Sequence, residues 1–177
     1  TLCTIDSGAD HADLTDEYAA MPVEMKAVAA FFGKEVLHDV DEAVFYRHIA
    51  EVRKVTGDRA VLRAIHFFNE NRRVKSQVQA LKDGDFDAFL HLVNASGMAS
   101  WTLLQNVTPA GYIQKQDMAF TIALCQQLLE GEGAVRIHGG GFAGTAVAFV
   151  PNDRFDRFKT CVEHVLGEGH CHKLTIR

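Results

Sequence analysis

Glycine occupies four of the six positions between residues 139 and 144: Gly139, Gly140, Gly141 and Gly144. Because glycine lacks a Cβ, such a backbone can adopt positive φ angles and approach another group closely. Successive N–H groups of a glycine-rich loop can also point into one concavity and bind an anion, usually a phosphate. The alternative is an ordinary mobile hairpin loop, but a hairpin needs only about two to five turn residues. The glycine content therefore favours a loop that faces a ligand or another domain.

Strand-forming residues flank this loop on both sides. Val135 and Ile137 alternate with polar residues, and a second run surrounds residues 147–149. His138 adjoins the glycines, and it is either an outward-facing strand residue or a polar neighbour of a bound phosphate or sugar. Phe142 lies inside the loop and is included in the predicted site. The sequence predicts a strand–loop–strand hairpin with this site at its tip.

Tyr18 is the other candidate for ligand contact, because it falls in the first turn of a predicted helix, just after a turn-rich loop. A tyrosine there either packs in the core with its hydroxyl at the rim or stacks on and hydrogen-bonds a polar ligand. No Ser-His-Asp order and no Cys-His pair stands out, and the acidic residues are spread along helices as on solvated faces. The residues alone therefore indicate a ligand-facing part of a site rather than a complete catalytic apparatus.

The cysteines favour neither a metal site nor a redox motif, because none of them forms a C-x-x-C pair. Cys171 lies between His170 and His172, which invites a metal interpretation. On a strand, however, alternate residues point to opposite faces, so this cysteine cannot join the two histidines on one metal. We predict reduced, partly buried thiols and no metal ligands.

The overall composition is that of a globular domain, with 177 residues, 47% hydrophobic and 23% charged. The net charge of −5 and the lack of a long basic cluster argue against a nucleic-acid partner. No apolar run approaches the roughly 18 residues of a membrane span, and no leader pattern is present. We expect a cytoplasmic protein with no membrane partner. Because Thr1 opens directly into a probable strand, we also expect the chain to be part of a longer one.

The predicted elements run in the order strand, several helices, strand, strand, helix, strand. Strands are expected at residues 2–5, 135–138, around 147–149 and at 172–176, and helices at 15–33, 41–49, 59–81, 86–93, 114–129 and 153–165, with 96–110 ambiguous. Thr15 is the expected N-cap of the first helix. The apolar stripe of the long helix is expected in the core: Leu62, Ile65, Phe68, Val74, Val78 and Leu81.

This order is the split β-α-β pattern of ferredoxin-like α+β domains, whose sheet is antiparallel. The additional helices would be inserted after the first strand. No repeat, linker or low-complexity segment interrupts the chain. We therefore expect one domain over residues 1–177.

The segment from Val135 to Pro151, V-R-I-H-G-G-G-F-A-G-T-A-V-A-F-V-P, resembles the third signature of galactokinases, V-R-M-T-G-G-G-F-G-G-C-x-V-A-L-x-P. Galactokinases belong to the GHMP small-molecule kinase superfamily. Two helical segments, from His66 to Val74 and from Ala80 to Asp85, are similar to the same C-terminal domain. Asp16 to Tyr18 resembles the S-E-Y segment in which galactokinases present a sugar-contacting tyrosine. The resemblance runs over about the whole chain.

The sequence also departs from the family pattern. Ala143 stands where a glycine is usual, and His138 where a threonine is usual. The segment from Ser96 to Ser100 is similar to the family's S-H-x-S segment but has Gly97 in place of its histidine. The galactose-recognition segment, the P-x-G-x-G-L-S-S-[SA] nucleotide loop and the catalytic Asp and Arg of the family's N-terminal half do not occur in these residues.

The resemblance therefore implies the C-terminal domain of a galactokinase, which would use ATP and Mg and phosphorylate galactose or a related sugar. Its partner would be the N-terminal kinase domain of the same chain. Tyr18 would bind the sugar, the loop from Gly139 to Gly144 would approach the reacting centre, and the catalytic residues would lie in the N-terminal domain. Two alternatives are a stand-alone ferredoxin-like module that binds an anion and regulates a partner, and a superfamily member that phosphorylates another small alcohol or senses sugar without catalysis.

Overall fold

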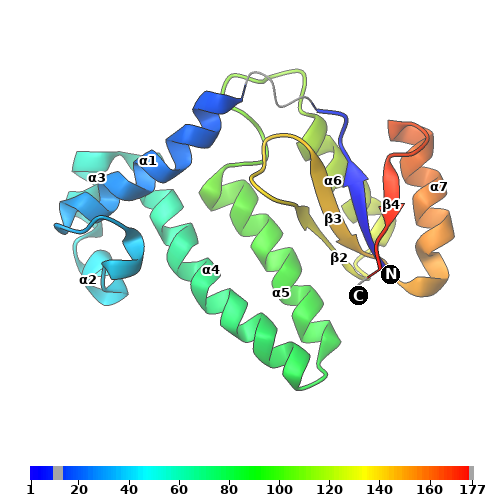
Figure 1. Ribbon diagram of the computed structural model, residues 1–177, viewed down its shortest axis with the longest axis horizontal. Helices are drawn as coiled ribbons and strands as arrows, with labels where there is room; N and C mark the ends of the chain where they lie inside the picture. The colour runs from blue at the N-terminus through cyan, green and yellow to red at the C-terminus, as the bar shows by residue number, and fades with distance from the viewer. Residues whose placement is uncertain (10–13, 176–177) are drawn as a thin grey trace.

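The computed structural model describes residues 1–9 and 14–175 and contains a four-stranded antiparallel sheet, in the right half of Figure 1. Its strands are β1 (Leu2–Asp6), β2 (Ala134–Ile137), β3 (Thr145–Phe149) and β4 (Cys171–Lys173). Their order in the sheet is β2-β3-β1-β4, and every neighbouring pair is antiparallel. This is the order of a ferredoxin-like sheet, and it confirms the predicted α+β class.

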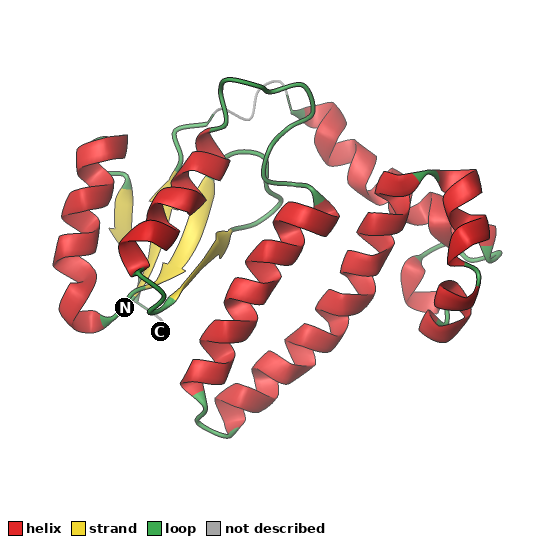
Figure 2. Ribbon diagram, turned by 180° about the vertical axis from the view of Figure 1, so that it is seen from behind, coloured by secondary structure: helices red, strands yellow, loops and turns green. Residues whose placement is uncertain are grey.

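Two helices cover one face of this sheet, α6 (Asp117–Leu129) and α7 (Phe155–Leu166) (Figures 1 and 2). Alternation along the strands sends Val135 and Ile137 of β2 to this face, where they join the main core. Cys171 is buried in the same core, whereas His172 beside it is exposed. The predicted orientation of this cysteine away from His172 is confirmed, whereas His170 precedes β4 and is not part of the strand.

Helix α5 (Phe86–Ala99) lies against β2 on the opposite face. Gly97 makes this approach possible, because a Cβ at this position would come within 2.9 Å of Cβ of Arg136 and 3.0 Å of the main-chain oxygen of Val135. Near the other end of α5, the Phe89 ring lies 5.4 Å from that of Phe149, edge to face. Close contact at one end and aromatic packing at the other hold this helix on the hairpin.

The remaining helices form a lobe beside the sheet, on the left of Figure 1. They are α1 (Thr15–Phe31), α2 (Glu42–Arg47), α3 (Ile49–Thr56) and α4 (Asp58–Lys82), with a short 3₁₀ turn at Leu37–Asp39; another such turn at Asn152–Arg154 precedes α7. The lobe has a core of its own around Val28, Phe45 and Val52, all fully buried. These helices are inserted after β1, as predicted. Among the described helices, none is both long and apolar enough to cross a bilayer.

The predicted burial of the long helix is wrong over its second half. Val74, Val78 and Leu81 are 49%, 46% and 52% exposed, whereas Phe68 is buried. The cause is the length of α4, whose first half packs in the lobe while its second half extends from it and packs along α5 (Figure 2). Helical periodicity indicates an apolar stripe, but it does not show how far along the helix a partner extends.

Several predicted boundaries also differ. Helix α1 begins at Thr15 itself and Leu14 precedes it, so this threonine is not the N-cap. The single helix expected at 41–49 is two helices, α2 and α3, which meet at His48. The helix expected at 86–93 continues to Ala99 and then widens into a π-helix, η2 (Ser100–Leu104). Residues 10–11, at the end of the turn-rich loop expected between the first strand and the first helix, and residue 176, the expected end of the last strand, lie outside the described residues.

Candidate functional site

The glycine loop joins β2 to β3 and forms the tip of the hairpin, next to the start of α1 and the end of α5 (Figure 1). Gly139, Gly141 and Gly144 have φ angles of +73°, +96° and +79°. These are left-handed conformations, in which other L-residues are strained. Gly139 and Gly140 are exposed, whereas Gly141 is buried. The loop therefore has an outer part open to solvent and an inner part anchored in the protein.

At Gly140 and Gly141, neighbouring residues leave no space for a side chain. A Cβ on Gly140 would lie 2.9 Å from Cε1 of Tyr18, and one on Gly141 would lie 2.3 Å from the main-chain oxygen of Asn106. A Cβ on Gly139 would meet nothing within 4 Å. The loop is thus packed between a tyrosine on one side and an asparagine on the other.

Tyr18 lies directly against this loop. Its hydroxyl donates a hydrogen bond of 2.5 Å to the main-chain oxygen of Gly141, and its ring meets that of Phe142 edge to face at 5.4 Å. The ring is half-buried, and burial raises the pKa of the phenol. The structure therefore brings together two parts of the predicted site that are far apart in the sequence.

The other predicted residues occupy different positions in the loop. Phe142 is only 2% exposed, has a φ of +59° and packs with Leu14, so its side chain anchors the loop from inside. His138 is exposed, and its Nδ1 lies 3.1 Å from Oγ1 of Thr145 across the hairpin. Within the predicted loop site, His138, Gly139 and Gly140 are therefore exposed, whereas Gly141 and Phe142 are buried.

Asn106 is a site residue that the sequence did not reveal. It lies in the segment of ambiguous structure and belongs to no motif, yet it is 2% exposed and its Nδ2 donates a 3.0 Å hydrogen bond to the main-chain oxygen of Gly140. Asn106 and Gly140 are 34 positions apart, so their contact produces no local sequence pattern from which it could have been predicted.

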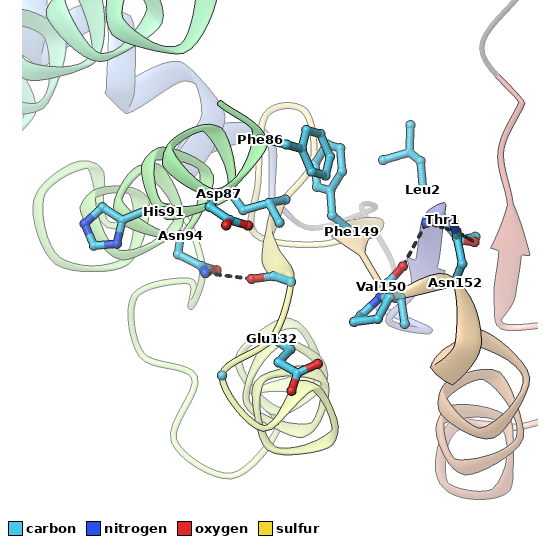
Figure 3. Close-up of a pocket in the computed structure, with 14 residues that line it drawn as sticks. Thr1, Leu2, Phe86, Asp87, His91, Asn94, Glu132, Phe149, Val150 and Asn152 are labelled. Atoms are coloured by element: carbon cyan, nitrogen blue, oxygen red, sulfur yellow. Dashed lines mark hydrogen bonds between the residues drawn. The ribbon is translucent and has the colours of Figure 1, made fainter. Parts of the chain in front are cut away.

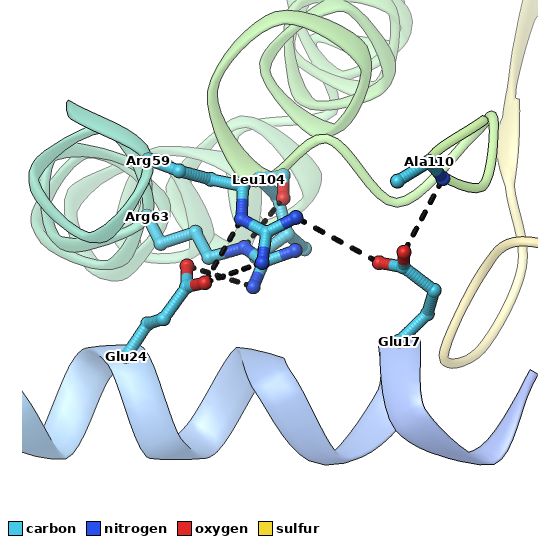
Figure 4. Close-up of polar contacts among 6 residues, drawn as sticks. All are labelled: Glu17, Glu24, Arg59, Arg63, Leu104 and Ala110. Carbon is cyan, nitrogen blue, oxygen red and sulfur yellow. Dashed lines mark hydrogen bonds and ion pairs between the residues drawn. The ribbon is translucent and has the colours of Figure 1, made fainter. Parts of the chain in front are cut away.

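An ion-pair network around the buried Arg63 holds α1, and with it Tyr18, in place (Figure 4). Nη1 of Arg63 on α4 lies 2.9 Å from Oε2 of Glu24 on α1, and its Nε donates to the main-chain oxygen of Leu104. Arg59 also donates to Glu24, at 2.6 Å. Because the side chain of Arg63 is fully buried, desolvation lowers its pKa, against the opposing effect of the glutamate. The network ties α1 to α4 and to the end of the π-helix.

The network reaches the loop before α6 through a second carboxylate. Oε1 of Glu17 accepts a 3.3 Å hydrogen bond from the main-chain N–H of Ala110, and its Oε2 lies 3.9 Å from Nη1 of Arg59. Glu17 directly precedes Tyr18 in α1. The segments that carry the tyrosine and the asparagine are therefore linked to each other independently of the glycine loop.

A pocket of about 790 Å³ lies at the opposite end of the β2–β3 hairpin (Figure 3). It is lined by aromatic residues of α5 and β3, including Phe86 and Phe149, and by the polar side chains of Asp87, His91 and Glu132. The glycine loop does not line it. Among the described residues, no three potential ligands lie close enough together to hold a metal ion, here or at the glycine loop.

Comparison with known proteins identifies relatives of the chain, although no family model matches it. The galactokinase of Actinobacillus succinogenes is 29% identical over 166 residues, which are 94% of this chain and 40% of that protein. The galactokinase of Mannheimia succiniciproducens is 30% identical over 158 residues, which are 89% of this chain and 39% of that protein. The chain thus spans about 40% of the length of these relatives.

Two solved structures share the fold. The galactokinase of Lactococcus lactis, complexed with galactose, matches 96% of this chain and 43% of its own with a TM-score of 0.69 at 23% identity. The mevalonate kinase of L. major, in complex with R-mevalonate, matches 99% of this chain and 43% of its own with a TM-score of 0.53 at 14% identity. The chain is therefore a relative of the galactokinases, and its sequence and fold fit a C-terminal domain of the GHMP family.

Proposed function

We propose that the chain is the C-terminal domain of a galactokinase-like sugar kinase, which transfers the γ-phosphoryl group of ATP to the 1-hydroxyl of galactose. The observation that carries the proposal is the glycine loop, which lies against Tyr18 and whose sequence is similar to the third galactokinase signature. ADP leaves as the P–O bond to the β-phosphate breaks and the bond to the sugar oxygen forms. The base that takes the hydroxyl proton is assigned to the N-terminal domain of the full-length kinase.

In this proposal the glycine loop is one wall of the cleft in which the sugar and the nucleotide meet. Phosphoryl transfer depends mainly on positioning and on stabilisation of charge around the transferred group. Gly139 and Gly140 are exposed, their N–H groups have no hydrogen-bond partner among the described residues, and neither residue has a side chain of its own that would hinder approach to an anionic group. Such a wall would also exclude water when the cleft closes.

The sugar is proposed to lie against Tyr18, at the side of the loop. This position follows from the ring's contact with Gly140 and from the similarity of residues 16–18 to the sugar-contacting segment of galactokinases. His138 is a further candidate for contact, because its ring is exposed beside the outer glycines.

ATP would supply the phosphoryl group, and the outer glycines fit an approach to its γ-phosphate. Since the described residues include no cluster of metal ligands, Mg²⁺ and most contacts to the nucleotide are assigned to the N-terminal domain of the full-length protein. The contribution of this chain is to position substrates and to exclude water.

The test is an ADP-release assay on the full-length protein with galactose, other hexoses and mevalonate. Mevalonate is included because the fold is shared with a mevalonate kinase. We expect turnover with galactose or a close relative, and none with the isolated chain of 177 residues. Turnover by the isolated chain, or sugar binding by the full-length protein without ADP release, would contradict the proposal; the latter would indicate a sensor.

A further inference from the structure

An unusual backbone path delivers Asn106 to the glycine loop. After α5 the chain widens into the π-helix η2 and then turns left-handed at Gln105, which has a φ of +56°. π-helical turns are frequent at functional sites, and a non-glycine residue in the left-handed region persists where its surroundings stabilise it. Asn106, which follows at once, is almost completely buried against the loop. The irregular path has one clear structural result, the placement of this side chain.

Asn106 fixes the peptide planes on both sides of Gly141. Its Nδ2 donates to the main-chain oxygen of Gly140, and its own main-chain oxygen accepts a 2.5 Å hydrogen bond from the N–H of Phe142. Because the peptides are trans, C=O and N–H of one peptide point in opposite directions. The first contact therefore directs the N–H of Gly141 away from Asn106. The second directs the Gly141 carbonyl toward the opposite side, where Tyr18 donates to it.

The side-chain amide of Asn106 is oriented so that its NH₂ group, and not its oxygen, faces the loop. Its Oδ1 is buried and has no hydrogen-bond partner among the described residues, whereas Nδ2 is engaged with the loop. A buried acceptor without a partner costs free energy. Asn106 therefore has a cost to stability, which favours a role in holding the loop over a role in general packing.

We propose that Asn106 is a positioning residue that fixes the two peptides flanking Gly141 and thereby anchors the inner end of the loop, whose outer part carries the N–H groups of Gly139 and Gly140. The inference rests on the proposed function, in which these groups face the transferred phosphoryl. Asn106 contacts neither substrate and acts only through the loop. A misplacement of about 1 Å in such a wall is enough to reduce turnover about 100-fold.

The test compares Asn106→Ala with Asn94→Ala in the full-length protein. Asn94 is a matched control, since it also makes two main-chain hydrogen bonds to the hairpin, with Gly133 and Val135, but at the end away from the loop. We expect amide hydrogen exchange in residues 138–145 to rise about tenfold or more in Asn106→Ala and to stay unchanged in Asn94→Ala. We expect kcat to fall about 10- to 100-fold in Asn106→Ala alone, with KM for ATP changed less than about threefold.

A second variant, Asn106→Asp, keeps the shape but removes the donor and places a carboxylate against the Gly140 oxygen. Protonation restores a donor, so we expect loop protection in this variant to recover as the pH is lowered, which a packing defect would not do. Unchanged exchange in the loop of Asn106→Ala overturns the inference, as does a loss of protection spread over the whole protein rather than concentrated in residues 138–145. Loop protection in Asn106→Asp that does not recover at low pH also overturns it. If the full-length protein lacks kinase activity, the proposed function fails, while the exchange data still decide whether Asn106 holds the loop.

Discussion

The hydroxyl of Tyr18 and the main-chain oxygen of Gly141 are joined by a 2.5 Å hydrogen bond, although 123 positions separate the two residues. The same tyrosine ring occupies the space where Gly140 has no side chain. A substrate that contacts the Tyr18 ring therefore contacts the residue that also holds the glycine loop. Changes at the sugar side of the site and changes in the loop are expected to be coupled.

Tyr18→Phe removes this hydrogen bond and keeps the ring. We expect KM for the sugar to rise about three- to tenfold in the full-length enzyme, because the hydroxyl that braces the loop and faces the proposed sugar position is lost, and one neutral hydrogen bond contributes about 0.5–1.5 kcal/mol. KM for ATP should stay nearly unchanged. The comparison is Tyr46→Phe, which alters a tyrosine of α2. Unchanged sugar kinetics and an unchanged melting temperature would identify Tyr18 as a packing residue, and equal weakening of both substrates would indicate an effect on domain closure.

Gly140→Val tests the close approach of loop and tyrosine. Gly140 does not need a left-handed φ, so the main obstacle to a side chain is the Tyr18 ring at 2.9 Å. We expect kcat/KM to fall at least about tenfold, with a smaller effect on stability. The double variant with Tyr18→Ala should lose less than the sum of the single losses, because the collision is gone. Additive losses in this double-mutant cycle would show that the collision is not the cause.

Glu24→Ala should be severely destabilising. It leaves the fully buried guanidinium of Arg63 without its carboxylate, and removing one partner of a buried ion pair costs about 3–5 kcal/mol. The free energy of unfolding in urea measures the loss. The matched control is Arg53→Gln, which breaks the exposed pair between Arg53 and Asp58 and should leave the unfolding midpoint nearly unchanged. Similar midpoints for the two variants would show that the buried pair does not hold α1.

Because His66 is buried, we expect the free energy of unfolding to decrease in mild acid. Burial lowers the pKa of this imidazole, with Glu70 opposing the effect and Arg73 and Arg136 adding to it. The unfolded chain therefore binds a proton that the folded chain does not, so the contribution is fully present above pH 6.5 and is lost as the pH falls below that value. Urea unfolding between about pH 5 and pH 8 should show this slope, and His66→Gln should reduce it. An equal slope in the variant would assign the pH dependence to other groups.

The sheet could be predicted from the sequence because its signals are local. The alternation around Val135 and Ile137 and the glycines between the strands identify the hairpin, and the order of elements fixes the topology. The burial of α4 could not be predicted, since Val74, Val78 and Leu81 have the same periodicity as residues that are buried earlier in the helix. The two halves of α4 differ in how far the neighbouring helices extend along them, and this cannot be read from the sequence of α4.

The site divides in the same way. Glycine content identified the loop, and a family resemblance identified Tyr18, whose contact with the loop the structure supplies. Asn106 and Arg63 gave no signal, because one follows an irregular turn and the other resembles any charged residue of a helix. Their importance lies in complete burial and in partners from distant segments, which only the folded chain brings together.

The contact between Gly97 and β2 limits which side chains can replace Gly97. Position 97 is where the galactokinase pattern has a histidine, yet here the helix is so close to the strand that even one added carbon atom would collide with the backbone of Val135 and with Arg136. A histidine could be accommodated only if α5 moved away from the hairpin, and the same helix leads into the π-turn that carries Asn106. A Gly97→His substitution on its own is therefore expected to disturb both the packing of α5 on the hairpin and the placement of Asn106.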